Sequence, residues 1–258
     1  MDQAWSYGVA AMSGGLVALL LTLFGGGGSV LATPLLLYAV GVKDAHVAIG
    51  TSAAAVAVNA AAGLIAQARA GRVKWPCALA FGAPGLAGSL VGAHVAKALP
   101  GDALLVWFAV AMAAVGLAMF RKPGAFGDSA VRIDTGKAMR LAPVGALTGL
   151  AAGFFGIGGG FLIAPGLMAA TGMTLANAAA SSLVSVTLFG AATSVSYAAA
   201  GLVDGPLLLA MVAGGAAGVA LGAASCRQGA AGATPVCRHD RRHGGLCRLA
   251  DAGGPVVE

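Results

Sequence analysis

The stretch Phe24-Gly-Gly-Gly-Gly-Ser-Val-Leu-Ala-Thr-Pro34 places four consecutive glycines inside an apolar run that is long enough to enter a bilayer. A similar stretch, Phe155-Gly-Ile-Gly-Gly-Gly-Phe-Leu-Ile-Ala-Pro165, follows 131 residues later with the Phe, most glycines and the Pro in register. Glycine at membrane depth raises the entropy lost on folding and exposes backbone groups that hydrocarbon cannot satisfy. Because the chain carries this cost in both halves, we expect the glycines to serve a function.

The composition indicates a membrane protein. Hydrophobic residues make up 59% of the 258 residues and charged residues only 9%, against roughly 25% charged residues in an average soluble domain. The basic residues behind the net charge of +6 fall between the apolar runs and near the C-terminus, where they indicate orientation in the membrane. We therefore expect an all-α polytopic membrane protein in a lipid bilayer, without a nucleic acid partner.

The apolar run 8–40 is too long for one spanning helix, which needs about 20 residues, and too short for two. The glycines predict a helix at 8–24, a break, and a shorter helix at 29–40. The other predicted spans are 45–66, 77–96, 103–120, 141–172 split at 156–160, 175–199 and 206–224. This pattern gives a first transmembrane repeat at 1–120, a basic cytoplasmic linker at 121–141, a second transmembrane repeat at 142–225 and a polar tail at 226–258.

The third span of each half carries a glycine stripe. The glycines are spaced by three and four residues, which places them on one helix face and predicts close helix packing. The two stripes are Gly85, Gly88 and Gly92, and their counterparts Gly215, Gly218 and Gly222.

The charges of equivalent loops predict that the repeats are inverted. The loop 67–76 carries Arg69, Arg72 and Lys74, whereas the equivalent loop 200–205 carries Asp204 and no basic residue. Because Lys and Arg favour the cytoplasmic side, the first loop and the linker are expected inside the cell and the second loop outside. Two inverted repeats, each opening with a glycine-broken helical hairpin, follow the organisation of many secondary transporters.

These segments resemble a known family. FGGGGSVLATPLLL, FGIGGGFLIAP, and the Gly50-Thr51-Ser52 and Ser181-Ser182 segments that begin the next helices are similar to the TauE/SafE (sulfite exporter, DUF81) membrane transporters. The similarity covers roughly residues 8–225. It implies transport of a small anion, such as sulfite, a sulfonate or a related organosulfur or carboxylate anion, generally across the bacterial inner (plasma) membrane.

The tail departs from the family pattern, which ordinarily ends with one more apolar helix. After Ala224 the sequence loses its apolar period, so the final helix is expected to be missing, and one hypothesis is a frameshift that the coding DNA would reveal. The tail contains Cys237, His239, His243 and Cys247, but their spacing fits no standard zinc finger, and no metal site is predicted.

Each glycine break is expected to expose the N-terminus of a helix inside the membrane. Its unpaired N–H groups and positive dipole end bind anions without a charged side chain. Pro34 and Pro165 are predicted kink points. The predicted substrate-binding residues are Gly26, Gly27, Gly28, Ser29, Thr33, Thr51, Ser52, Asn59, Gly158, Gly159, Gly160, Ser181, Ser182 and Ser185. The alternative is that the glycines only let helices cross closely and that the hydroxyls bond to their own helices.

The predicted spans contain no Asp, Glu, Lys or Arg near their middle, so the usual intramembrane carboxylate of a proton pump is missing. Coupling would then use groups near the span ends, such as Asp44, His46 or His94, or transport would follow the anion gradient. Ordinary interfacial roles are the alternative for the histidines. Gln67, near the basic loop, is expected to be solvated.

The predicted function is secondary transport of a small anionic solute by alternating access. The alternatives are a non-transporting membrane scaffold or accessory subunit, an anion channel and, as the weakest, an intramembrane enzyme. The sequence offers no catalytic triad or paired carboxylates, and its glycine runs do not match a dinucleotide-binding motif. We therefore expect no enzymatic activity and no cofactor, and a homo-oligomer stays open.

Overall fold

The computed structural model describes residues 3–121, 135–156, 160–172 and 174–232. The chain divides into two compact units, Met1–Ala223 and Ala224–Glu258. In the second unit the described residues continue a helix of the first, and everything that follows concerns the first unit. All regular elements in the described ranges are helices, as the sequence predicts.

The helices of the first half are α1 (Gln3–Phe24), a 3-10 helix η1 (Gly25–Leu31), a single turn α2 (Ala32–Pro34), a π-helix η2 (Leu35–Val40), α3 (Ala45–Arg69), α4 (Trp75–Lys97) and α5 (Gly101–Arg121). The second half contains α6 (Thr135–Phe155), α7 (Gly160–Thr171), α8 (Leu175–Ala198) and α9 (Gly205–Gly232). Most bounds lie within a few residues of those predicted. α6 begins earlier, inside the segment predicted as linker, and α9 extends beyond the predicted end at 224.

The first glycine run differs in detail from the prediction. A broken segment followed by a helix from Ser29 was expected, but the chain turns at one residue, Gly25, whose φ is +68°. The next glycines are already wound into η1. A positive φ is accessible to glycine without steric cost, so one residue is enough to redirect the chain. The second break follows the same plan, because α6 ends at Phe155 and Gly156 has a φ of +66°.

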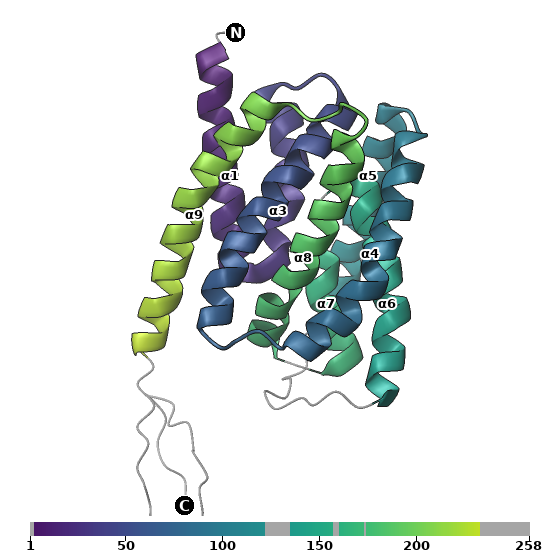
Figure 1. Cartoon of the computed structure of the whole chain (residues 1–258), viewed down its shortest axis with the longest axis vertical. Helices are drawn as coiled ribbons and strands as arrows, with labels where there is room; N and C mark the ends of the chain where they lie inside the picture. The colour runs from purple at the N-terminus through teal and green to yellow at the C-terminus, as the bar shows by residue number, and fades with distance from the viewer. Residues whose placement is uncertain (1–2, 122–134, 157–159, 173, 233–258) are drawn as a thin grey trace, which may run out of the picture. The chain divides into compact units, whose positions relative to one another are not determined.

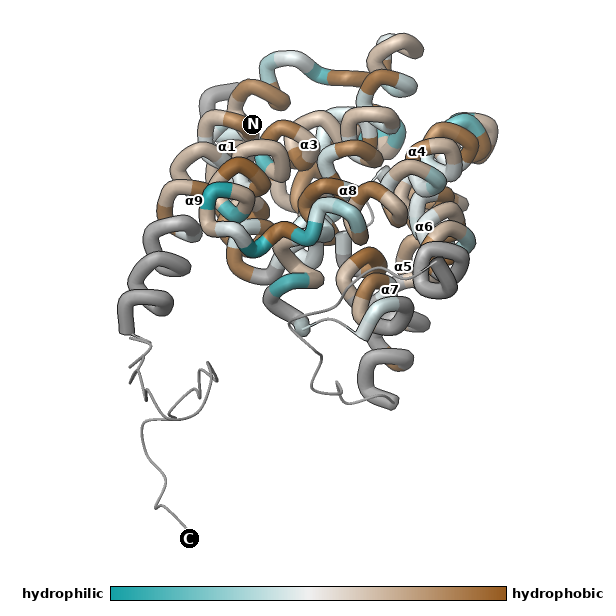
Figure 2. The backbone as a smooth tube through the Cα atoms, turned by 60° about the horizontal axis from the view of Figure 1, so that its bottom comes forward, coloured by the Kyte–Doolittle hydropathy of each residue, from teal (hydrophilic) through white to brown (hydrophobic). Residues whose placement is uncertain are grey.

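The helices have the length and surface of a membrane protein. Among the described residues five are long and apolar enough to cross a bilayer: Trp5–Leu23, Ala45–Arg69, Trp75–Lys97, Asn177–Ala198 and Gly205–Gly222. Figure 2 shows apolar colour along much of these helices. Large apolar side chains such as Met12 (78% exposed) and Leu209 (70% exposed) face outward, as expected for contact with lipid tails. The chain is therefore a multi-pass membrane protein.

α3 and α8 form the centre of the unit. The share of buried residues is 72% in the α3 span and 67% in the α8 span, against 39% or less in the other three. α4 packs along α6, and α9 packs along α1. The predicted glycine stripes make these contacts: a Cβ added at Gly88 would meet the carbonyl of Ala146, and one at Gly218 would meet the carbonyl of Gly15. The close-packing role of the stripes is confirmed.

Backbone features recur in the two halves. All six described glycines with positive φ form three pairs separated by 130 or 131 residues: Gly25 and Gly156, Gly41 and Gly172, Gly71 and Gly201. In Figure 1, matched helices run in opposite directions: α1, α3 and α9 run downward, whereas α6, α8 and α4 run upward.

The loops gather at two ends of this unit. Asp44 and the loop 199–204 lie at one end, called here the Asp44 end; the loop 70–74, the end of α5 and the start of α6 lie at the other, called here the Arg72 end.

Candidate functional site

The two glycine breaks meet inside the protein. A Cβ added at Gly26 would collide with the backbone of Gly160, and a Cβ added at Gly160 would collide with the backbone of Gly26. Both glycines are buried. Because no side chain separates the two segments, the start of η1 and the start of α7 are in direct backbone contact, and only glycine fits at either position.

Ser182 of α8 holds the first break. The Gly26 N–H donates a hydrogen bond to Ser182 Oγ at 3.2 Å, and the Ser182 hydroxyl donates to the Ala179 carbonyl of its own helix at 2.8 Å. The Ser29 hydroxyl donates to the Gly26 carbonyl at 2.7 Å. Two predicted hydroxyls therefore lie at this glycine, and one of them comes from the opposite half of the chain.

Each break rests on the long central helix of the other half. A Cβ added at Gly25 would meet the backbone of Ala179 in α8, and one added at Gly156 would meet the Ile49 side chain in α3. Ala179 follows Ile49 by 130 residues, so the two contacts are equivalents in the repeat. A movement of one half relative to the other would therefore change the surroundings of both breaks together.

Thr33 and Ser52 form a second polar contact near the first break. Their hydroxyl oxygens lie 2.8 Å apart, and both residues are buried. Ser52 directs its single O–H to the Ile49 carbonyl at 3.0 Å, so Thr33 donates to Ser52. Pro34 ends α2 and the π-helix η2 begins at the next residue, consistent with a local change of winding at this proline.

Thr51 and Ser181 contact loops at the two ends of the unit rather than the breaks. The Asp204 N–H donates to Thr51 Oγ1 at 3.0 Å, and the Lys74 N–H donates to Ser181 Oγ at 3.0 Å. Each hydroxyl belongs to one half and each loop to the other, and the two bonds are related by a shift of 130 residues. We call this pair of bonds the loop latches.

Asn59 and Ser185 are deeply buried and hold unpaired polar atoms. Asn59 is 2% exposed and Ser185 fully buried, and Asn59 Nδ2 and Ser185 Oγ have no hydrogen-bond partner among the described residues. Asn59 faces Gly215 of α9, and Ser185 Oγ lies 3.5 Å from a Cβ built at Gly82 of α4. Each buried polar atom without a hydrogen bond destabilises the fold by about 1–3 kcal/mol, so such atoms are unusual in a folded core.

Gly27 and Gly28 differ in the space around them. A Cβ at Gly27 meets no described atom within 4 Å, and the residue is half-buried, whereas a Cβ at Gly28 would collide with the end of α1 at Leu20 and Leu21. Among the glycines of η1, Gly27 is therefore the one whose Cβ direction meets none of the described atoms. The predicted site residues Gly158 and Gly159 lie outside the described residues, as does the side chain of Pro165.

Sequence reasoning assigned Gln67 to solvent, and the structure shows otherwise. Gln67 is 9% exposed, and its Nε2 donates to the Thr22 carbonyl at 3.2 Å, in the last turn of α1. A side-chain amide here satisfies a carbonyl that lies just before the Gly25 turn, where the helical hydrogen bonds stop. Position alone, beside a basic loop, gave no sign of this contact, which joins residues 45 positions apart.

The described polar groups near the first break are uncharged. They are the Gly26 N–H and the hydroxyls of Ser29, Thr33, Ser52 and Ser182, and each of them donates to another group of the protein. In general, free backbone N–H groups at the start of a helix stabilise anions through their partial charges.

Comparisons with known proteins agree with this architecture. The profile of the family described as Sulfite exporter TauE/SafE matches residues 10–231. A "Probable membrane transporter protein" of Xylella fastidiosa (strain 9a5c) is 48% identical over 212 residues, which cover 81% of each chain. The "Probable membrane transporter protein YdhB" of Bacillus subtilis (strain 168) is 25% identical over 205 residues, covering 77% of this chain and 81% of the relative. No solved structure matches.

The profile match spans most of the chain and both glycine breaks, and the similarity to the Xylella protein is well above the level at which relatives share a fold. Together with the five apolar helices, these findings identify the chain as a membrane transporter that belongs to the TauE/SafE sulfite exporter family.

Proposed function

We propose that this protein is a secondary transporter that moves a small anion across the bacterial inner membrane by alternating access. The observation that carries the proposal is the backbone contact between Gly26 and Gly160, since it brings two helix breaks from the two halves to one place. Paired broken helices that meet inside the membrane are the usual substrate site of secondary transporters.

The proposal includes two inverted repeats. Three observations support it: matched helices run in opposite directions in Figure 1, each break rests on the opposite half, and the loop latches repeat after 130 residues. In such an arrangement a change at one end of the molecule has a mirror counterpart at the other. Opening at the Asp44 end would break one latch, and opening at the Arg72 end would break the other.

The proposed substrate class is a small anion: sulfite, a sulfonate or a related carboxylate. The starts of two helices at the breaks support this choice, as does the description of the family as sulfite exporters. We propose that the anion binds beside Gly27, whose Cβ direction meets none of the described atoms, and that Gly26, Ser29, Ser52 and Ser182 hold the backbone around it. Asn59 and Ser185 are proposed to gain contacts to the anion in another state of the cycle, which would account for their unpaired atoms.

The test is uptake by proteoliposomes that contain the purified chain. Radiolabelled sulfite, methanesulfonate and acetate are offered separately, and uptake is compared with that of liposomes without protein. We expect saturable uptake of at least one anion, reduced tenfold or more by Gly27→Leu. A flux that never saturates would indicate an anion channel. The absence of uptake for all three anions would favour a non-transporting membrane scaffold or accessory subunit.

A matched control separates loss of binding from loss of folding. Gly41→Leu places the same side chain at another glycine with open space, in a loop at the Asp44 end, although its φ of +84° adds local strain. Gly8→Leu, which also has open space and lies near the start of α1, adds none. Uptake is expected to survive Gly8→Leu with the wild-type affinity.

A further inference from the structure

Tyr197 lies at a junction of three helices near the Asp44 end. It belongs to α8 and is fully buried. Its ring lies 6.5 Å, centroid to centroid, from the imidazole of His46 in α3, and Lys97 Nζ of α4 lies 5.9 Å from its ring centre. A tyrosine in this position connects one titratable residue near the membrane surface with the interior of the protein.

This junction contains an unusual set of unpaired polar atoms. His46 Nδ1, Tyr197 Oη and Thr193 Oγ1 are buried and have no hydrogen-bond partner among the described residues. Thr193 precedes Tyr197 by four residues on α8, so the two lie on the same helix face. Three such atoms would together destabilise the fold by several times the cost of one, about 1–3 kcal/mol. Two of these atoms, His46 Nδ1 and Tyr197 Oη, belong to rings that lie next to each other.

The junction is joined to the second glycine break by direct packing. Tyr197 shares a buried apolar cluster with Ile49, and Phe154 packs against the same cluster. Ile49 is the residue that a Cβ at Gly156 would meet. A change of charge or hydrogen bonding at His46 therefore acts on side chains that also position the break.

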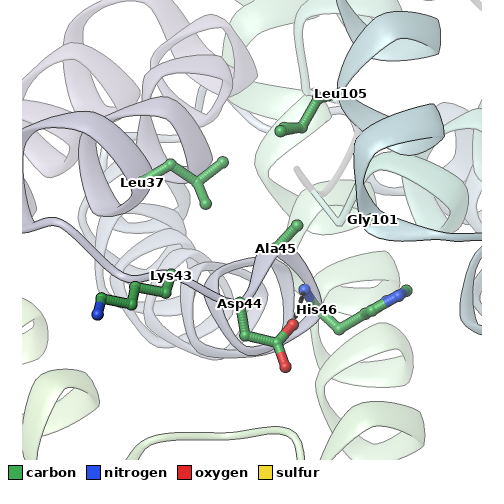
Figure 3. A pocket seen from close by; sticks show the side chains of 7 residues that line it. All are labelled: Leu37, Lys43, Asp44, Ala45, His46, Gly101 and Leu105. Carbon is green, nitrogen blue, oxygen red and sulfur yellow. Dashed lines mark hydrogen bonds between the residues drawn. The ribbon is translucent and has the colours of Figure 1, made fainter.

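His46 also borders a pocket at the Asp44 end. The pocket has a volume of about 390 Å³ and is lined by Leu37, Lys43, Asp44, Ala45, His46, Gly101 and Leu105. Figure 3 shows these side chains, with the Asp44 carboxylate bonded to the backbone N–H of His46. The imidazole is half-buried, so it has one side toward this surface and a buried Nδ1. The pocket therefore gives solvent access to the exposed side of the ring, while Nδ1 is shielded.

The charged groups around the imidazole have other contacts. Lys97 donates to the Ser196 carbonyl at 3.1 Å and to Ser196 Oγ at 2.8 Å, which holds its charge at the end of α8. The Asp44 carboxylate accepts the N–H of His46 at 2.8 Å as the cap of α3. Lys43 extends away from the imidazole in Figure 3. Histidine is the side-chain type that changes charge between pH 5 and 8.

His94 and Asp44 are the other two residues near span ends that the sequence suggested for coupling, and neither contacts the buried junction. His94 is exposed, and its Nδ1 is bonded to the Leu90 carbonyl of its own helix at 2.9 Å. Asp44 is committed to the cap of α3. His46 is the member of this group that contacts the buried junction.

We propose that His46 Nδ1 and Tyr197 Oη form a proton-binding site that couples proton movement to transport of the anion; this inference rests on the proposed transport function. In one state the neutral imidazole turns Nδ1 toward the pocket and takes up a proton there, and the ring then returns Nδ1 to its buried position. The N–H bond forms as an O–H bond of a hydronium ion breaks and leaves water, and the new N–H donates to Tyr197 Oη. In the other state the contact between the two rings is lost and the proton returns to water.

The test compares two assays on the same proteoliposomes, with empty liposomes subtracted. One measures exchange of radiolabelled sulfite for unlabelled sulfite at equal pH, and the other measures sulfite accumulation driven by a pH gradient. We expect His46→Gln to lower accumulation tenfold or more while exchange stays within twofold of the wild type. Tyr197→Phe, which removes only the hydroxyl, is expected to lower accumulation at least threefold. His94→Gln is the control and should change neither rate.

The outcomes separate the two proposals. Normal exchange with normal gradient-driven accumulation in His46→Gln would overturn the coupling site and leave transport intact. Absence of exchange in the wild type would count against sulfite transport itself, and a second measurement then tests the site without a substrate. In NMR spectra of ¹⁵N-histidine-labelled protein, the signal lost in His46→Gln should shift between pH 5 and 8.5, and Tyr197→Phe should alter that shift. A His46 signal that is constant over this range, or unaffected by Tyr197→Phe, would overturn the site.

Discussion

Gly26 and Gly160 touch backbone to backbone, so a methyl group on either residue would overlap the other chain segment. The first prediction follows from this contact. Gly26→Ala and Gly160→Ala should each lower the free energy of unfolding by about 1–3 kcal/mol, the usual cost of overpacking a tight core. Thermal unfolding of the detergent-solubilised protein measures the effect.

Gly27→Ala is the matched control for this prediction, since its Cβ meets no described atom within 4 Å. It should stay within about 0.5 kcal/mol of the wild type, because the added methyl group meets none of the described atoms. Equal stability losses at Gly26 and Gly27 would show that the two segments are not in contact.

The loop latches predict local changes in hydrogen exchange. Thr51→Val keeps the shape of the side chain but removes the acceptor of the Asp204 N–H, and Ser181→Ala removes the acceptor of the Lys74 N–H. Each variant should lose about 1 kcal/mol of stability, the net value of one hydrogen bond. In hydrogen–deuterium exchange, Thr51→Val should speed exchange in the loop around Asp204 alone, and Ser181→Ala in the loop around Lys74 alone.

Thr148→Val serves as the control for the latches, because this hydroxyl donates to the Val144 carbonyl of its own helix. It should leave both loops protected. Faster exchange in both loops with any single variant would mean that the bonds do not act separately.

Ser185 offers a contrast with the neighbouring Ser181. Its hydroxyl is buried without a partner among the described residues, so Ser185→Ala removes an unsatisfied group and no hydrogen bond. We expect the variant to be as stable as the wild type, or more stable by about 1 kcal/mol. Its anion uptake should nevertheless fall, since the hydroxyl is proposed to contact the substrate in another state. Unfolding and uptake are measured on one preparation, and a variant with unchanged uptake would remove Ser185 from the site.

Ala70 and Ala200 test the inversion of the repeats. They are exposed, equivalent residues in the loops at opposite ends of the unit. With the four native cysteines replaced by serine, Ala200→Cys should react with a membrane-impermeant maleimide in intact cells. Ala70→Cys should react only after the membrane is permeabilised, because basic loops stay in the cytoplasm. Labelling of both positions from the same side would be incompatible with inverted repeats.

The fold was predictable from the sequence because its main signals are local. The lengths of the apolar runs predict the helices. The glycine stripes that include Gly88 and Gly218 predict where two helices approach closely. The position of the turn was less predictable. Four equivalent-looking glycines gave no reason to select Gly25, and the choice depends on the contact of this residue with Ala179 in the other half.

The candidate site was predictable only in part, since hydroxyls have several possible partners. Ser52 and Ser182 occupy the expected place beside the first break, with Thr33 and Gly26 as partners. Thr51 and Ser181 precede them by one residue and point to the loops, a difference of one step around a helix that sequence spacing does not resolve. Gln67 shows the same limit, because its partner lies in another helix.

The measurement that tests the account most directly is anion-dependent stabilisation of the purified protein. Sulfite, methanesulfonate and acetate are titrated at constant ionic strength, and the midpoint of thermal unfolding is followed. A ligand that binds the folded state raises this midpoint in a saturable way. The account predicts such a rise for at least one anion with the wild type and with Gly8→Leu, and its loss in Gly27→Leu while the anion-free midpoint is unchanged. A full rise in Gly27→Leu, or no rise with any of the three anions, would contradict an anion site at the glycine break.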